Sequence, residues 1–322
     1  MADFLLGLPS EAAITAGQFG RGFRQWAWSG FVQDSWRATP RLTVNLGLRY
    51  DYTAPWTEVN GKLSNLLGSE GLLSASASGF PGAWQPDRNN FATRVGIAFD
   101  PHGRGRTVIR AGFGVMYETL LQANSVELLE NNPPFSSLAV TRTPTPFSSD
   151  GSPSRTLTDL AGLAEPSRSI GAVGSFRNPY TMQFHAGVQR QFGQGGAGEI
   201  SYKGSHGVRL PVYRNANQVP VEALGSAKRE EIAAAIAAGR DTTSILQPLR
   251  PYPDFDAVTL SENVASSTYH SGQVRVAYRV GPRLLFDTAY TFSKSIDNAS
   301  DFNSFDPSEA VLNAFDRICL PG

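Results

Sequence analysis

Cysteine, charge and long apolar runs are all scarce in this sequence. The 322 residues include a single cysteine, Cys319, so no internal disulfide can form. Only 17% of the residues are charged, against about 25% in a typical soluble protein. The 28 basic and 28 acidic residues cancel, so the chain has no overall charge that would attract nucleic acid. No apolar run reaches the roughly 18 residues of a transmembrane helix, which excludes that element.

Recognisable catalytic and export signals are missing as well. The first ten residues lack the basic start and apolar stretch of a secretory signal peptide. Gly112 and Gly114 lie within an expected strand rather than between a strand and a helix, and no nucleophile elbow surrounds Ser205. The histidines lack the spacing of a metal site: His102, His185, His206 and His270. Of these, His185 and His270 are expected to face a lumen or a solvated surface. We therefore expect no catalytic residue, no metal and no cofactor, and a protein that is not an enzyme.

Alternation with a period of two residues is the main pattern that is present. Residues 42–52 show it most clearly, because every second side chain is apolar and successive side chains of a strand point to opposite faces. One face carries Leu42, Val44, Leu46, Leu48, Tyr50 and Tyr52, and the other carries Thr43, Asn45, Gly47, Arg49 and Asp51. Comparable segments are residues 25–37, 91–99, 109–118, 180–192, 198–204, 269–280 and 284–295.

These segments form about eight strands in four hairpins, with connections of two lengths. Each hairpin has a short internal turn, whereas residues 53–89, 119–179 and 205–268 form long connections between hairpins. Compact soluble domains rarely carry such loops, but transmembrane barrels have short periplasmic turns and long extracellular loops. We therefore expect an all-β, antiparallel and partial transmembrane β-barrel. Residues 219–240 are expected to form a helix within an extracellular loop, and a packed loop helix is favoured over a lid.

The chemistry of the two faces favours a membrane barrel over a soluble β-sandwich. Each segment spans about 9–13 residues, close to the roughly 9–11 that cross a bilayer when tilted. Aromatic residues with a polar tip gather near strand ends, as in the interfacial girdles of such barrels. The aromatic residues expected at the membrane interface are Trp36, Tyr50, Tyr52, Tyr117, Tyr180 and Tyr269.

The opposite face mixes glycine and alanine with isolated charges, which suits a wet and crowded barrel interior. The residues that could line this lumen are Arg49, Asp51, Arg94, Arg110 and Glu118. Structural ion pairs between neighbouring strands are the favoured interpretation of these charges, and a role in lining a passage is the alternative.

Several segments resemble one family. Residues 31–50, FVQDSWRATPRLTVNLGLRY, are similar to the paired strands of TonB-dependent outer-membrane receptors. Residues 89–96, 107–114, 178–180 and 290–297 resemble the Oar-like branch of that family, in the same order. The resemblance implies a barrel of about 22 strands, an N-terminal plug and a TonB box. Neither a plug nor a TonB box is recognisable here, so residues 1–322 are interpreted as a partial barrel domain from the middle of a longer protein.

The expected function is therefore the barrel portion of a TonB-dependent transporter in the bacterial outer membrane, for an unidentified ligand. Its expected partner in the membrane is outer-membrane lipid. The TonB system is expected to act only through the plug and TonB box of a longer parent protein, and no nucleic-acid partner is expected. Two alternatives stay open. One is a stand-alone small barrel acting as an adhesin or a membrane enzyme, and the other is a soluble β-sandwich binding module.

Overall fold

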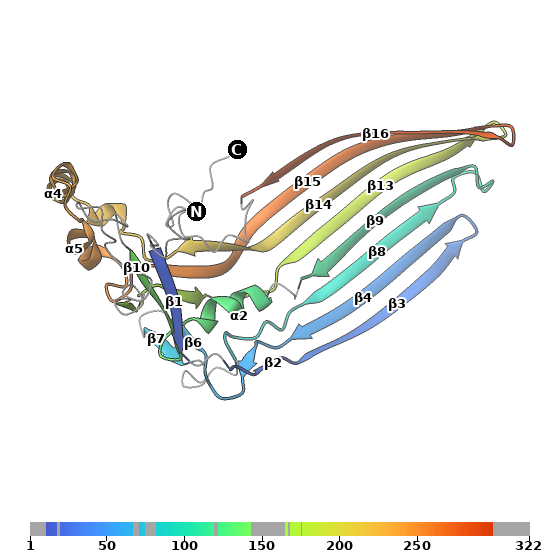
Figure 1. Ribbon diagram of the computed structural model, residues 1–322. Coiled ribbons are helices and arrows are strands. Elements are labelled where there is room, and N and C mark those ends of the chain that lie inside the picture. Colours follow the sequence, from blue (N-terminus) through green and yellow to red (C-terminus); the bar gives the residue numbers. More distant parts are fainter. Residues whose placement is uncertain are drawn as a thin grey trace.

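The computed structural model describes residues 11–17, 20–66, 71–74, 82–118, 122–142, 165–166, 168–174 and 176–298. Within these residues, eight long strands form one antiparallel sheet in which strands that follow each other along the chain are neighbours (Figure 1). In sheet order they are β3 (Ala27–Thr39), β4 (Leu42–Thr53), β8 (Phe91–Phe99), β9 (Thr107–Tyr117), β13 (Tyr180–Phe192), β14 (Gly196–Asn215), β15 (Val258–Val280) and β16 (Leu284–Asp297). The expected eight strands in four hairpins are therefore confirmed.

The sheet is open. Strand β3 pairs with β4, and β16 pairs with β15, and these two edge strands do not pair with each other within the described residues. Figure 1 shows the sheet as a curved wall with β3 and β16 at opposite margins. A short strand, β12 (Ile170–Val173), adds to the first part of β15 in parallel orientation, next to the edge that β16 occupies further along β15. The described strands thus form part of a barrel wall rather than a closed barrel.

The four short turns lie at one end of the sheet (Figure 1). Glycines with positive φ, which residues with a Cβ rarely adopt, form three of them: Gly103 and Gly105, Gly193, and Gly281. The carboxylate of Asp100 accepts hydrogen bonds from the backbone N–H groups of Gly105 at 2.7 Å and Gly103 at 3.0 Å. These bonds, that of Gly105 above all, lower the pKa of Asp100 below its ordinary value. The turn between β8 and β9 is therefore locked by its own residues.

The third long connection is shorter than the expected 205–268, and all three contain regular elements. Strand β14 continues to Asn215 and β15 starts at Val258, so the third connection is confined to residues 216–257. It contains η2 (Val221–Ala223), α4 (Ser226–Ala237), α5 (Thr243–Leu246) and η3 (Gln247–Leu249), and α4 falls within the 219–240 segment expected to be helical. The first connection, between β4 and β8, contains β5 (Thr57–Glu58), β6 (Ser64–Leu66) and β7 (Leu72–Ser74). The second, between β9 and β13, contains α2 (Gln122–Glu130), β10 (Ser136–Arg142), β11 (Glu165–Pro166) and β12. Two further strands, β1 (Glu11–Gly17) and β2 (Phe23–Arg24), precede the wall. The helices in the described part of the chain all fall short of the length and apolar character needed to cross a membrane.

Most of the buried apolar core lies in these connections and not in the eight long strands. We call residues 54–66, 71–74, 82–90, 122–136, 168–174, 176–179 and 216–257 the loop layer, which lies at the end of the sheet opposite the short turns (Figure 1). One apolar cluster joins Leu63, Trp84, Leu129 and Val173, and a second surrounds Val258. The wall itself exposes both of its faces, so in the described residues the loop layer holds the best-packed apolar side chains.

Buried asparagines bind the segments of the loop layer together. The Asn132 amide donates to the carbonyls of Ser64 at 2.9 Å and Gly171 at 2.7 Å, and its oxygen accepts from Gly171 N–H at 2.8 Å. Asn65 likewise pairs with both backbone polar groups of Val173, and Asn217 does so with Tyr252. Because buried backbone polar groups must find partners, these amides replace the ladder bonds that the irregular segments lack.

A partly exposed carboxylate, that of Glu58, plays the same role at the edge of the loop layer. Burial acts to raise the pKa of Glu58, but hydrogen bonds from the backbone N–H groups of Gly22, Lys62 and Asn60 outweigh it. The pKa of Glu58 is therefore lower than its ordinary value, and the carboxylate stays ionised while it holds three backbone donors.

Candidate functional site

The register of the wall separates its side chains into two faces. Across the sheet Val44 lies opposite Ile97, Ile97 opposite Ala111, and Ala111 opposite Ala186. One residue further along each strand, Asn45 lies opposite Gly96, and the row continues on the other face through Gly112, His185, Lys203, Ser271 and Ser293. Because neighbouring strands keep this phase, the alternation of each strand becomes one apolar face and one polar face.

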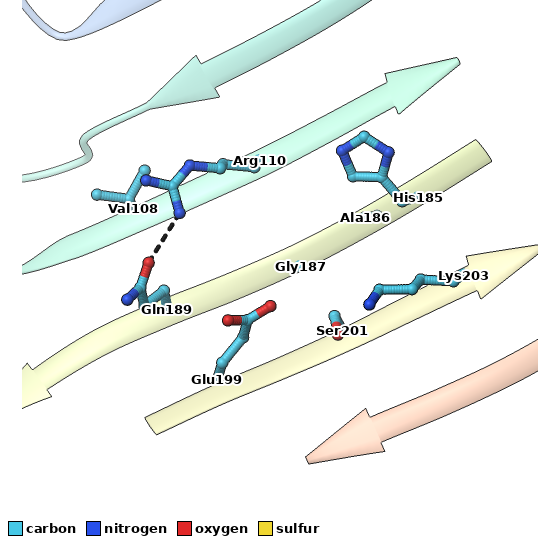
Figure 2. A pocket seen from close by; sticks show the side chains of 9 residues that line it. All are labelled: Val108, Arg110, His185, Ala186, Gly187, Gln189, Glu199, Ser201 and Lys203. Atoms are coloured by element: carbon cyan, nitrogen blue, oxygen red, sulfur yellow. Dashed lines mark hydrogen bonds between the residues drawn. The ribbon is translucent and has the colours of Figure 1, made fainter. Parts of the chain in front are cut away.

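A concavity of about 220 Å³ lies on the polar face across β9, β13 and β14 (Figure 2). Its centre carries small residues, Gly187 and Ser201, which lie opposite each other on β13 and β14. A Cβ on Gly187 would come within 3.0 Å of the Ser201 Cβ, so only glycine leaves this space unchanged. Longer polar side chains surround it, namely Arg110, His185, Gln189, Glu199 and Lys203. The concavity is thus a hollow with a small-residue centre and a polar rim on the described wall.

Hydrogen bonds between strands fix part of this rim. Arg110 Nη1 donates to Gln189 Oε1 at 2.7 Å, and Figure 2 shows the two side chains reaching toward each other from β9 and β13. Lys203 Nζ donates to Gln273 Oε1 at 3.1 Å, from β14 to β15. The rim therefore presents cationic, anionic and amide groups together, which suits a polar ligand or a polar protein surface more than an apolar one.

The charged residues expected to line the lumen all belong to polar-phase positions, although they do not form one cluster. Arg49 and Asp51 form an ion pair of 2.8 Å within a single strand, and not between strands as expected. Arg94 lies between Gly47 and Gly114 of the neighbouring strands, whose missing side chains leave room for its stem. Of these residues only Arg110 borders the concavity. Glu118 follows the end of β9, where its backbone N–H donates to the carbonyl of Pro179 at 2.9 Å.

An ion pair between strands does occur elsewhere on this face. Arg275 of β15 and Asp287 of β16 pair through two hydrogen bonds, and both side chains are partly exposed. Such exposed pairs contribute little to stability, because water screens them. The charges of the polar face are therefore compatible with a wet interior and are not a major source of stability.

Aromatic side chains collect on the apolar face at the loop-layer end of the strands. Trp28 lies 5.0 Å from Tyr50 and 6.1 Å from Tyr52 between ring centroids. Tyr117 and Tyr180 lie opposite each other on β9 and β13, with centroids 5.4 Å apart. Trp36 lies on the same face near the short turn, opposite Val44.

Two expectations about faces are corrected by the register. Tyr269 lies opposite Ser205 and Ser295 in the same phase as Gln273, so it belongs to the polar face and not to the aromatic group. His270, expected to face a lumen or solvent, lies on the apolar face instead. The reason is simple: the strand residues of β15 alternate without a bulge from 267 to 280, and the odd numbers fall on the polar side.

Sequence reasoning did not single out most of the rim. The sequence alone predicts only that His185 faces a lumen or solvent, and it does not single out Gln189, Glu199 and Lys203 as site residues. The alternation of residues 180–204 contains the signal, because a tight turn at 193–195 sets the register that pairs Gln189 with Glu199 and His185 with Lys203. Within the described residues no three side chains of the His, Cys, Asp and Glu types lie together in a way that could hold a metal ion.

A comparison with family models decides the family of this open wall. The model described as "Outer membrane beta barrel domain" matches residues 1–318. The chain belongs to this outer membrane β-barrel family. The expected all-β barrel class and the bacterial outer-membrane location are thereby confirmed, and the soluble β-sandwich alternative is wrong.

A curated relative agrees with the resemblance found in the sequence. The barrel domain is 37% identical over 89 residues to the TonB-dependent transporter Oar of Myxococcus xanthus. That alignment covers 28% of this chain and 6% of Oar, so the chain corresponds to a small part of that protein. The resemblance to Oar-like TonB-dependent transporters is confirmed.

Solved structures similar to the barrel domain include a siderophore receptor and an outer membrane transporter. The siderophore receptor PirA of Pseudomonas aeruginosa is 12% identical with a TM-score of 0.38, and the match covers 85% of this chain and 37% of PirA. The outer membrane transporter YddB of Escherichia coli is 8% identical with a TM-score of 0.39, covering 86% of this chain and 34% of YddB. The chain thus spans little more than a third of either structure.

Proposed function

We propose that this chain forms part of the wall of a TonB-dependent transporter in the outer membrane, with its apolar face toward lipid and its polar face toward the lumen. The separation of the two faces carries the proposal. In the apolar face large side chains are exposed along whole strands, for example Ile200 at 68% and Phe292 at 72%. Surfaces of this extent require an apolar partner, and the hydrocarbon of the membrane supplies one along the entire strand.

The polar face then lines the route of a ligand or contacts a plug within the lumen. The rim of the concavity near Gly187 offers donors and acceptors from three neighbouring strands, which suits recognition of a polar solute. The TonB system would act through a plug and TonB box elsewhere in the full-length protein. We propose no enzymatic role, because the hydroxyl of Ser201, the candidate nucleophile among the residues that line the concavity, forms no hydrogen bond to a base.

Uptake by the producing bacterium tests this function. Cells with and without the gene are grown in the same medium, and the solutes that only gene-bearing cells deplete are identified by mass spectrometry. We expect depletion of at least one solute, and we expect it to stop when tonB is inactivated. If deletion of the gene changes no solute, the transport proposal is contradicted.

A matched pair of variants in the gene-bearing strain tests the role of the polar face. Gln189→Trp places a large ring at the rim of the concavity, whereas Val188→Trp places the same ring on the apolar face of the adjacent position. Uptake is expected to fall several-fold for Gln189→Trp and to stay near the wild-type rate for Val188→Trp. Equal loss in both would indicate damage to the fold and not blockage of a lumen.

A further inference from the structure

Three basic side chains interrupt the apolar face on its last three strands. The register aligns Gly204 of β14 with His270 of β15 and Lys294 of β16, so both basic residues belong to the apolar face. His206 occupies the same face two residues further along β14, opposite Thr268. His270 and Lys294 are exposed, and no described carboxylate forms an ion pair with Lys294. Cations without a counter-charge are out of place on a surface toward hydrocarbon.

The three residues lie at the same number of residues along their strands from the short-turn end. Each is the eleventh residue of its strand counted from the short-turn end, since β14 begins at Gly196, β15 ends at Val280 and β16 begins at Leu284. Ten steps of about 3.3 Å, tilted by about 40°, rise about 25 Å, which equals the height of the apolar band of such barrels.

The same count links these residues to the aromatic group of the other strands. Tyr52 and Tyr117 are the eleventh residues of β4 and β9, counted from the short-turn end of each strand. The basic residues therefore continue the interfacial row that tyrosines form elsewhere on the wall. This position places them where lipid headgroups meet the protein.

Local contacts orient the two histidines. The Tyr202 hydroxyl lies 2.5 Å from His270 Nδ1, with the two rings stacked at 6.0 Å between centroids. His206 Nδ1 lies 2.9 Å from Thr268 Oγ1. Where a hydroxyl donates to Nδ1, the neutral ring carries its proton on Nε2 and can donate it outward. Next to His270, Gly272 leaves open space, since a Cβ there would meet nothing within 4 Å.

We propose that His206, His270 and Lys294 bind the phosphate of a lipid headgroup in the outer membrane. This inference rests on the proposed function in one respect, namely that the apolar face meets lipid. Lysine supplies the charge, and the imidazole N–H groups supply directed hydrogen bonds, a combination that suits a phosphate. The open space at Gly272, bordered by the rings of Tyr202 and Phe292 on the neighbouring strands, accommodates part of an acyl chain.

Lipid binding to the full chain, purified in an uncharged detergent, tests the site. Diphosphorylated lipid A is titrated and detected by native mass spectrometry, with dephosphorylated lipid A and inorganic phosphate as the other probes. We expect binding of the phosphorylated lipid alone, and about tenfold weaker binding by Lys294→Gln and by His270→Gln. The matched control is Lys228→Gln, because Lys228 lies exposed on helix α4, away from the wall.

Three outcomes would overturn the site. Equal weakening by Lys228→Gln and Lys294→Gln would indicate a general charge effect. Binding of inorganic phosphate with the same dependence on Lys294 would indicate a site for a free anion and not for a lipid. Binding of dephosphorylated lipid A as tightly as the phosphorylated form would remove the role of the phosphate.

A fluorescence measurement distinguishes rejection of the headgroup site from rejection of the proposed function. In vesicles whose lipids carry brominated acyl chains, Trp28 and Trp36 on the apolar face are expected to be quenched. Without quenching, the apolar face does not meet lipid and the proposed function fails together with the site. Quenching combined with unchanged lipid binding by Lys294→Gln leaves the orientation intact and rejects the headgroup site alone.

Discussion

Val95→Arg is expected to lower the free energy of unfolding from lipid vesicles by about 2–4 kcal/mol. Val95 is the central residue of β8, and it lies opposite Leu46 and Phe113 on the apolar face. Its side chain is 43% exposed in the wall, so the surface that it covers must be covered by lipid. A guanidinium at mid-height of the apolar band would lose its hydration without gaining a partner.

The adjacent residue provides the control. Gly96→Arg places the same charge on the polar face, where the nearest atoms to a new Cβ are those of Asn45 at 3.8 Å, an ordinary contact distance. Its unfolding free energy is expected to change by less than about 1 kcal/mol. Titration with guanidinium chloride measures both variants. Equal losses for the two would show that the faces do not differ in environment.

Asn132→Ala is expected to destabilise the loop layer locally by about 3 kcal/mol or more, because it leaves buried backbone groups without partners. The Asn132 side chain is 1% exposed and makes hydrogen bonds to both polar groups of Gly171 and to the Ser64 carbonyl. Alanine restores none of them. The apolar cluster that contains Leu129 packs beside these bonds and is expected to loosen with them.

Amide hydrogen exchange separates this local effect from an effect on the wall. In Asn132→Ala, the amides of Gly171 and Val173 are expected to exchange about a hundredfold faster, which corresponds to about 3 kcal/mol. The amides in the central strands β8 and β9 are expected to keep their protection. Asn60→Ala is the control, since Asn60 is exposed on a turn and its backbone alone takes part in the described hydrogen bonding. Unchanged exchange at Gly171 in Asn132→Ala would refute the role of this amide.

The strands and their hairpins could be predicted because their causes are local. Alternation sets the faces of each strand, and glycines with positive φ such as Gly193 and Gly281 end the hairpins. The two errors of face have a local cause as well. Tyr269 is aromatic and lies near an expected strand end, but its phase with Gln273 places it on the polar side. In this protein the position of a residue in the alternation of its strand predicts its face of the sheet better than its residue type does.

The loop layer could not be predicted because its structure depends on distant partners. Asn132 bonds to Gly171, and Asn65 bonds to Val173, across 39 and 108 residues of the chain. An isolated asparagine in a proline-rich and glycine-rich connection indicates only a turn. Gly171 also depends on a distant partner, because a Cβ there would come within 2.1 Å of the Leu128 carbonyl oxygen of helix α2.

The candidate concavity could be predicted only in part, less well than the strands and better than the loop layer. Its residues have the polar phase that alternation predicts, and Arg110 was expected to be lumen-facing. The position of the hollow depends on Gly187 and Ser201 lying opposite each other, which requires the register of β13 with β14. The length of a turn determines that register, but the sequence does not show which of several small residues meet.

Accessibility of single cysteines along β13 tests the central claim, that one face of this wall meets lipid and the other meets water. In a Cys319→Ser background, a cysteine is placed in turn at each of the positions 184–189, and the protein is inserted into vesicles. A water-soluble maleimide is expected to label positions 185, 187 and 189, and a maleimide that partitions into hydrocarbon is expected to label positions 184, 186 and 188. Equal labelling of all six positions by the water-soluble reagent would contradict the account.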